Sequence, residues 1–176
     1  EGFNPLLSPN GKWLAYLLLQ GTDSGPRLNL LNLENAHARE IAEMPGSSRN
    51  FMAFPWYFGM RDFQWSSRNE LWFVQGSTRE GSRILRVDPA TGGPAPGNPY
   101  TGAGTTSCRV RGNTPSTPTT TCQEIYASGF RNPWRFAFDP NAAGVRAFVN
   151  DVGQGTREEV DELVAGGNYG WPTREG

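Results

Sequence analysis

The sequence lacks a long apolar run, an excess of charge of one sign, and the Cys and His motifs that usually bind transition metals. Its longest apolar stretch, residues 13–19, is far too short to cross a bilayer, so we expect no membrane span. Lys and Arg number 16 against 17 Asp and Glu, which excludes the basic surface typical of a nucleic-acid-binding protein. A single histidine and the absence of a Cys-x-x-Cys pair argue against a zinc centre.

Signals for processing and for serine hydrolase chemistry are missing too. No Gly-x-Ser-x-Gly elbow occurs, which argues against a serine peptidase. The given sequence begins with Glu1, and neither an initiator Met nor a signal peptide is recognisable in it. We therefore expect a processed or excised chain from which any targeting segment has been removed.

Glycine, proline and aromatic residues are abundant instead. The 176 residues include 22 Gly and 14 Pro but are only 36% hydrophobic, which favours many turns between short elements. Six Trp and ten Phe favour strands and supply large apolar side chains for a core. The composition predicts an all-β domain, and the chain is long enough to bury a hydrophobic core.

Strand-like runs recur between turn signals along the whole chain. The run at residues 27–33 alternates imperfectly between apolar and polar residues, as a half-buried strand does. Residues 158–164 could instead begin a short helix, which Gly166 and Gly167 would end. The candidate strands are residues 13–19, 27–33, 39–42, 83–88, 134–138, 147–151 and 159–164, and residues 63–74 form a strand, a turn and a second strand.

One turn phrase, rich in Ser, Asp, Pro and Asn, recurs at Ser8, Ser66 and Asp139, each time with a strand-like run after it. Recurrence of one unit indicates a repeat architecture, and short strands in that pattern favour a β-propeller. A blade of four antiparallel strands takes about 40–50 residues, so we expect about three to four blades. Such a propeller is partial, and we expect missing sequence or another copy, in a homo-oligomer, to complete it.

The two cysteines, Cys108 and Cys122, lie within a loop predicted at residues 97–122 that is rich in Thr, Gly, Pro and Ser. They form either a disulfide or two free thiols. An even count around a loop favours the disulfide, and a loop of this length would gain about 3 kcal/mol from closure. A disulfide predicts an oxidising compartment, so we expect a secreted or periplasmic protein.

Two resemblances divide the chain into residues 1–82 and 83–176. The first part resembles the β-propeller repeats of Tol-type periplasmic proteins and prolyl-oligopeptidase-like enzymes, through residues 7–16 and 63–66. This motif is common to many propellers and therefore predicts a fold without predicting a function.

The second part resembles the glucose/sorbosone dehydrogenase family of soluble quinoproteins. The family implies a six-bladed propeller that binds calcium and pyrroloquinoline quinone and oxidises a sugar by hydride transfer to the quinone. Five short motifs carry this resemblance, at residues 84–89, 129–135, 150–154, 158–160 and 166–172.

The resemblance assigns roles to two groups of residues. Arg131 and Asn132 would contact the anionic cofactor. Gly153 and Gln154 would supply backbone carbonyls to a calcium site, which Asp151 would also line. The alternatives are a simple turn before a strand at residues 131–133 and an ordinary blade loop at the glycine. Glu158, Glu159, Asp161 and Glu162 form either a carboxylate cluster or a solvated strand face, and the solvated face is the favoured interpretation.

The family also implies a general-base histidine. His37, the only histidine, falls in a turn of the first part, and no motif assigns it that role, so a surface position is the better interpretation. Two hypotheses follow. The chain is a fragment or derivative of a secreted sugar dehydrogenase, incomplete for catalysis alone, or it is a non-catalytic propeller module for extracellular binding or assembly.

Overall fold

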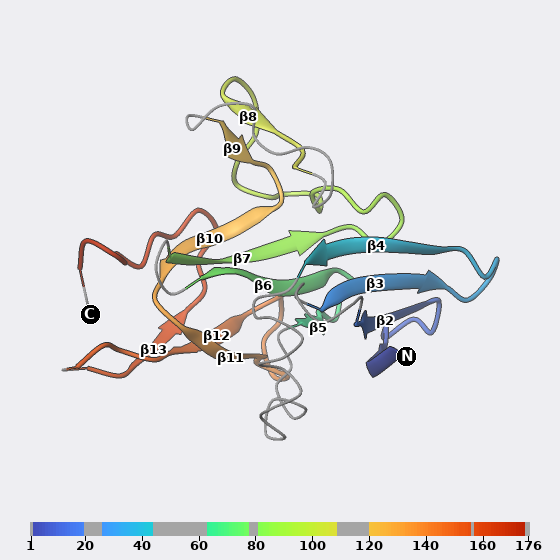
Figure 1. Ribbon diagram of the computed structural model, residues 1–176, viewed down its shortest axis with the longest axis horizontal. Helices are drawn as coiled ribbons and strands as arrows, with labels where there is room; N and C mark the ends of the chain where they lie inside the picture. The colour runs from blue at the N-terminus through green and yellow to red at the C-terminus, as the bar shows by residue number, and fades with distance from the viewer. Residues whose placement is uncertain are drawn as a thin grey trace.

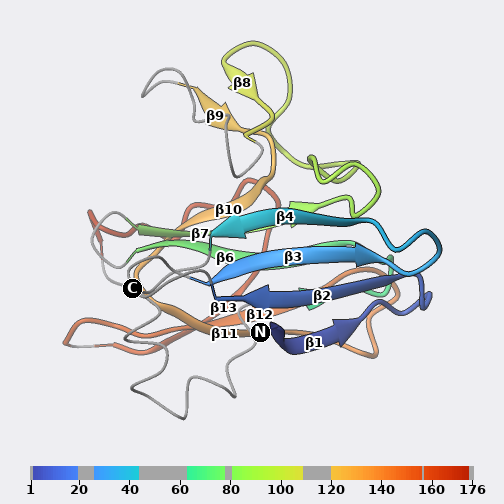
Figure 2. The same ribbon diagram turned by 45° about the vertical axis from the view of Figure 1, so that its right-hand side comes forward.

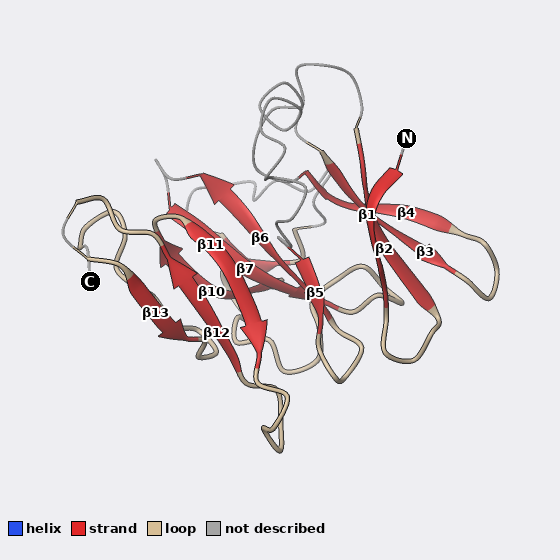
Figure 3. Cartoon of the chain, turned by 90° about the horizontal axis from the view of Figure 1, so that it is seen from below, coloured by secondary structure: helices blue, strands red, loops and turns tan. Residues whose placement is uncertain are grey.

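The computed structural model describes residues 2–19, 26–43, 63–77, 81–108, 120–155 and 157–174. The described residues form strands and loops without a helix, so none of them forms a helix long and apolar enough to span a membrane. Three antiparallel sheets carry the fold, and Figure 3 shows them side by side. The expected all-β class is confirmed, and residues 159–162, where a helix was the alternative, form a strand.

The first sheet has four strands in chain order, visible as a stack in Figure 2. Its strands are β1 (Gly2–Leu7), β2 (Trp13–Leu18), β3 (Arg27–Asn32) and β4 (Ala38–Glu43). Sequence patterns did not predict β1. Its pairing with β2 is interrupted by a bulge, where Asn4 has a φ of +53°, and the strand therefore lacks clean alternation.

The second sheet also has four strands and adds its last one from a distance. Its strands are β5 (Phe63–Trp65), β6 (Leu71–Ser77), β7 (Gly81–Val87) and β10 (Ile125–Phe130). Between β7 and β10 the chain leaves the sheet and forms a parallel pair, β8 (Thr105–Thr106) and β9 (Thr121–Cys122). This pair projects from the sheets at the top of Figure 1. The predicted disulfide between Cys108 and Cys122 is confirmed.

The third sheet has three strands in chain order: β11 (Pro133–Phe138), β12 (Ala147–Asp151) and β13 (Glu159–Glu162). The first strands of the three sheets are neighbours. The Trp65 indole donates to the Leu6 carbonyl, and the Gln64 amide donates to the Phe136 carbonyl. These bonds join β5 to both β1 and β11, which is the arrangement of propeller blades around an axis.

The middle sheet is buried on both faces. Along β6, Leu71 and Phe73 pack into a core shared with the first sheet, whereas Trp72 and Val74 pack into a second core with the third sheet. All four side chains are buried. Because successive strand residues point to opposite faces, this continuous apolar run is what a blade between two blades requires.

The turn phrase found in the sequence joins the first and second strands in each of the three sheets. Ser8, Ser66 and Asp139 each donate a backbone N–H across the turn that they open. The first two turns also touch, since Asn10 donates its backbone N–H to the Asn69 side chain over 2.8 Å. The repeat interpretation of the sequence is confirmed.

Candidate functional site

Three of the recognised motifs meet at one end of the second and third sheets. Arg131 and Asn132 form the turn between β10 and β11, and Asp151 ends β12. The segment 166–171 runs beside β10, with a parallel bridge between Ser128 and Asn168. We call this junction the Arg131 rim: residues 129–132, 151–154 and 166–171.

The Asp151 carboxylate holds the backbone of the Arg131 turn. It accepts the N–H of Arg131 at 2.9 Å and the N–H of Asn132 at 2.6 Å. Asp151 as a whole residue is 5% exposed, so both bonds are shielded from water. Burial raises the pKa of Asp151, while the two N–H bonds and the charge of Arg131 counteract that shift and Glu158 adds to it.

The Arg131 guanidinium binds the loop that follows β12. Its Nη1 donates to the carbonyl oxygens of Val152 and Gly153, each at 2.7 Å. The guanidinium carbon lies 5.6 Å from the centre of the Trp171 ring, a cation–π distance. The structure thus brings Arg131, a predicted cofactor residue, next to Gly153, a predicted metal residue. The two are donor and acceptor of one hydrogen bond.

The other two predicted residues differ in exposure. Asn132 is half-buried, and no described residue is a hydrogen-bond partner of its side-chain amide. Gln154 is exposed. Gly153 does not have the positive φ expected of a glycine in a blade loop, and its N–H donates to the Glu158 carboxylate at 3.1 Å.

Tyr169 and Gly129 hold the segment 166–171 against β10. The aromatic side chain of Tyr169, beside a Gly-rich turn, predicts a structural role for it. The Tyr169 ring stacks on Phe130 at 4.5 Å, and its hydroxyl donates to the Glu162 carbonyl at the end of β13. The backbone N–H of Trp171 donates to the Gly129 carbonyl at 2.9 Å. For Gly129, its position within a motif was the only signal in the sequence.

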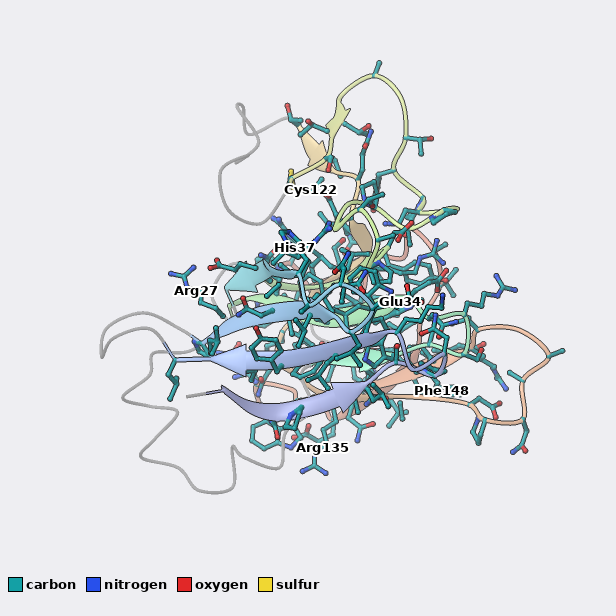
Figure 4. All side chains as sticks on the ribbon, turned by 90° about the vertical axis from the view of Figure 1, so that its right-hand side faces the viewer. Arg27, Glu34, His37, Cys122, Arg135 and Phe148 are labelled. Carbon is teal, nitrogen blue, oxygen red and sulfur yellow. A yellow bond between two sulfur atoms is a disulfide. The ribbon has the colours of Figure 1, made fainter. Side chains whose placement is uncertain are left out.

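His37 lies at the opposite end of the sheets. It is exposed, in the turn between β3 and β4, and that turn adjoins the β1–β2 turn through the Leu33 N–H and the Lys12 carbonyl. In Figure 1 this turn is on the right, whereas β10 ends on the left. Figure 4 looks onto the end that carries His37. The surface position expected for this histidine agrees with the structure.

A carboxylate cluster includes Asp151 of the Arg131 rim and two acidic residues of β13. Asp151, Glu159 and Asp161 have oxygens within 4.8 Å of one another on the face of the third sheet that points toward the second. Burial first, and then the charges of Glu159 and Asp151, raises the pKa of Asp161 from its usual 3.8 to about 6. The sequence predicted a solvated face here, but only Glu158 and Glu162 of this segment's acids are exposed.

Asp161→Asn is expected to stabilise the protein at neutral pH. Because the folded-state pKa lies above the unfolded one, wild-type stability falls as the pH rises from about 4 to about 6 and is then level. The gain at pH 7.5 is less than about 1 kcal/mol, since solvent screens the half-buried group. Urea unfolding at pH 4 and pH 7.5 measures it.

Glu162→Gln is the matched control, and its expected effect on stability is opposite in sign to that of Asp161→Asn. A hydrogen bond from Arg146 lowers the pKa of Glu162, so removing its charge is expected to decrease stability at pH 7.5. If Asp161→Asn also decreased stability at that pH, the repulsion inferred among the three carboxylates would be contradicted.

Solved structures of sugar dehydrogenases are similar to this chain in fold. The quinone-bound aldose sugar dehydrogenase of Streptomyces coelicolor matches with a TM-score of 0.59 and 20% identity, over 99% of this chain and 49% of that chain. The apo-form soluble aldose sugar dehydrogenase of Escherichia coli matches with a TM-score of 0.57 and 18% identity, over 96% and 48%. The chain is thus a set of β-propeller blades.

The family assignment rests on sequence. The profile of the glucose/sorbosone dehydrogenase family matches residues 66–176, and the chain belongs to that family. It is similar to the HIPL2 protein of Arabidopsis thaliana, with 53% identity over 53 residues, which are 30% of this chain and 8% of that protein. Quinoprotein glucose dehydrogenase B of Acinetobacter calcoaceticus is 40% identical over 52 residues, 30% of this chain and 10% of that protein.

The chain covers about half the length of the structures it matches and a tenth or less of these two curated relatives. The division into residues 1–82 and 83–176 stays a prediction.

Proposed function

We propose that this chain is a fragment of, or derives from, a secreted quinoprotein sugar dehydrogenase, and that the Arg131 rim contacts pyrroloquinoline quinone. One observation carries the proposal. The Asp151 carboxylate fixes the backbone of the Arg131 turn through two hydrogen bonds. Among the described residues, Nε and Nη2 of Arg131 and the Asn132 side-chain amide have no hydrogen-bond partner. A planar guanidinium and a neighbouring amide suit the carboxylates and oxygens of an anionic quinone.

The donor set of the rim therefore fits the quinone. Arg131 and Asn132 would bind and orient the quinone, and the cation–π contact with the Trp171 ring would hold the guanidinium in place. When bound, the quinone would supply the hydride acceptor for an aldose substrate. The calcium predicted at Gly153 and Gln154 does not fit equally well, because the Gly153 carbonyl already accepts a bond from a charged group.

Quinone binding is expected to raise the melting temperature of the chain. At a quinone concentration about 100 times the dissociation constant, the shift should be roughly 5–10 °C for a protein of this size. Arg131→Ala should abolish the shift. Arg135→Ala, which removes an exposed arginine from β11, is the matched control and should retain it. An equal shift in all three proteins, or none in the wild type, would overturn the proposal.

A non-catalytic propeller module is the second candidate, and the position of His37 favours it for this chain alone. His37 lies at the other end of the sheets from the rim, whereas a catalytic base must lie within hydrogen-bond reach of the sugar hydroxyl. Aldose-dependent dye reduction by the quinone-loaded chain separates the candidates: turnover supports the enzyme, and its absence supports the module.

We also propose that further blades, from missing sequence or from a second copy, cover the outer sheets. Leu7 on the first sheet is 54% exposed and Val160 on the third is 71% exposed, both on faces that point away from the middle sheet. The disulfide supports a secreted or periplasmic location.

A further inference from the structure

A single nitrogen of Arg131 occupies the position that a cation would take in the loop after β12. The carbonyls of Val152 and Gly153 are consecutive, and both direct their oxygens at Nη1 over 2.7 Å. A backbone that turns two successive carbonyls toward one positive centre forms the kind of oxygen pair that also binds Ca²⁺. In this chain the positive centre is a side chain.

The surroundings hold Arg131 in that position. Its backbone N–H is bound to Asp151, 20 residues later, and its guanidinium lies against the Trp171 ring. The carbonyls it binds directly follow Asp151 in the chain. The same strand end thus fixes both the backbone of the arginine and the oxygens that its side chain binds.

A calcium ion on the same oxygens would compete with the guanidinium. At the usual Ca–O distance of about 2.4 Å, an ion on the Gly153 carbonyl would lie no more than about 5 Å from Nη1. Two cations would then share one pair of oxygens, and repulsion between them opposes simultaneous binding.

We propose that Arg131 is the resident cation of the rim and that it competes with divalent cations for the carbonyl oxygens of Val152 and Gly153. The loop after β12 is then held without a metal ion. This inference rests on the proposed function in placing a cofactor site at the rim, but its test requires no quinone. The ligand class that would replace the arginine is a hard divalent cation such as Ca²⁺.

Calorimetric titration with CaCl₂ and thermal melting in CaCl₂ or EDTA test the proposal on the whole chain. The wild-type melting temperature should be the same in both solutions. Arg131→Ala should melt at a lower temperature in EDTA, recover in part with CaCl₂, and bind Ca²⁺ at least tenfold more tightly than the wild type. Arg131→Lys keeps a cation near the oxygens and should stay insensitive to calcium.

Arg135→Ala is the control and should behave as the wild type does in every solution. If Arg131→Ala does not fold, the wild type and Arg131→Lys still decide the question. A wild-type melting temperature that rises in CaCl₂ by as much as that of Arg131→Ala would overturn the proposal, and so would calcium binding that is unaffected by the arginine. Either result would leave the quinone experiment unchanged.

Discussion

Gly129→Ala is expected to cost about 4 kcal/mol or more of unfolding free energy and to disrupt the Arg131 rim. An added Cβ would lie 2.2 Å from the Asn168 side-chain oxygen and 2.9 Å from the backbone nitrogens of Tyr169 and Gly170. Backbone atoms cannot move away without breaking the hydrogen bonds that hold this segment beside β10. The φ of +81° adds strain for any residue with a side chain.

Gly102→Ala is the control that separates the steric clash of an added Cβ from the backbone strain of a positive φ. Gly102 has a φ of +90°, and an added Cβ there would meet nothing within 4 Å. Its substitution should cost about 1–2 kcal/mol, the penalty of the backbone conformation alone. Denaturant unfolding of both variants measures the difference. Equal costs would mean that the segment 166–171 does not approach β10 as closely as the structure shows.

Asp151→Ala is expected to cost about 3 kcal/mol. The substitution leaves the N–H groups of Arg131 and Asn132 without their acceptor in a buried position, and bonds to a charged group contribute about 1.5–3 kcal/mol each. Asp151→Asn keeps one acceptor oxygen and removes the cost of burying a charge, so it should cost about half as much.

Asp139→Ala is the matched control for Asp151→Ala. Asp139 opens the turn at the other end of β11 and β12, and one of its oxygens accepts the Asn141 N–H in an exposed position. Its loss should cost no more than about 1 kcal/mol. Urea unfolding compares the two, and a larger cost for Asp139→Ala would contradict the anchoring role given to Asp151.

The propeller could be predicted because each blade repeats the same turn chemistry in a short stretch of chain. Ser8, Ser66 and Asp139 lie in the same place in three sheets, and local hydrogen bonds suffice to form their turns. The strand β10 was missed for the opposite reason. Bulges interrupt its pairing with β7 around Ser128, and Gly129 lowers strand propensity, so only the tertiary partners make this segment a strand.

Motifs in the sequence indicated the candidate residues of the site, and their proposed cofactor roles stay predictions, but their mutual contacts were not predicted. Arg131 and Gly153 are 22 residues apart, and their hydrogen bond depends on the register that places Asp151 opposite Pro133. Register is a property of the paired strands and of the core beneath them. Motif order therefore indicated which residues gather at the rim, whereas only the structure shows that the arginine binds the carbonyls itself.

The exchange rates of the Arg131 and Asn132 amide protons test the construction of the rim most directly. If Asp151 accepts both N–H groups, the two amides should exchange on the order of a thousandfold more slowly than in an unstructured peptide, and Asp151→Ala should remove the protection from both together. Rapid exchange of these amides in the wild type would contradict the account.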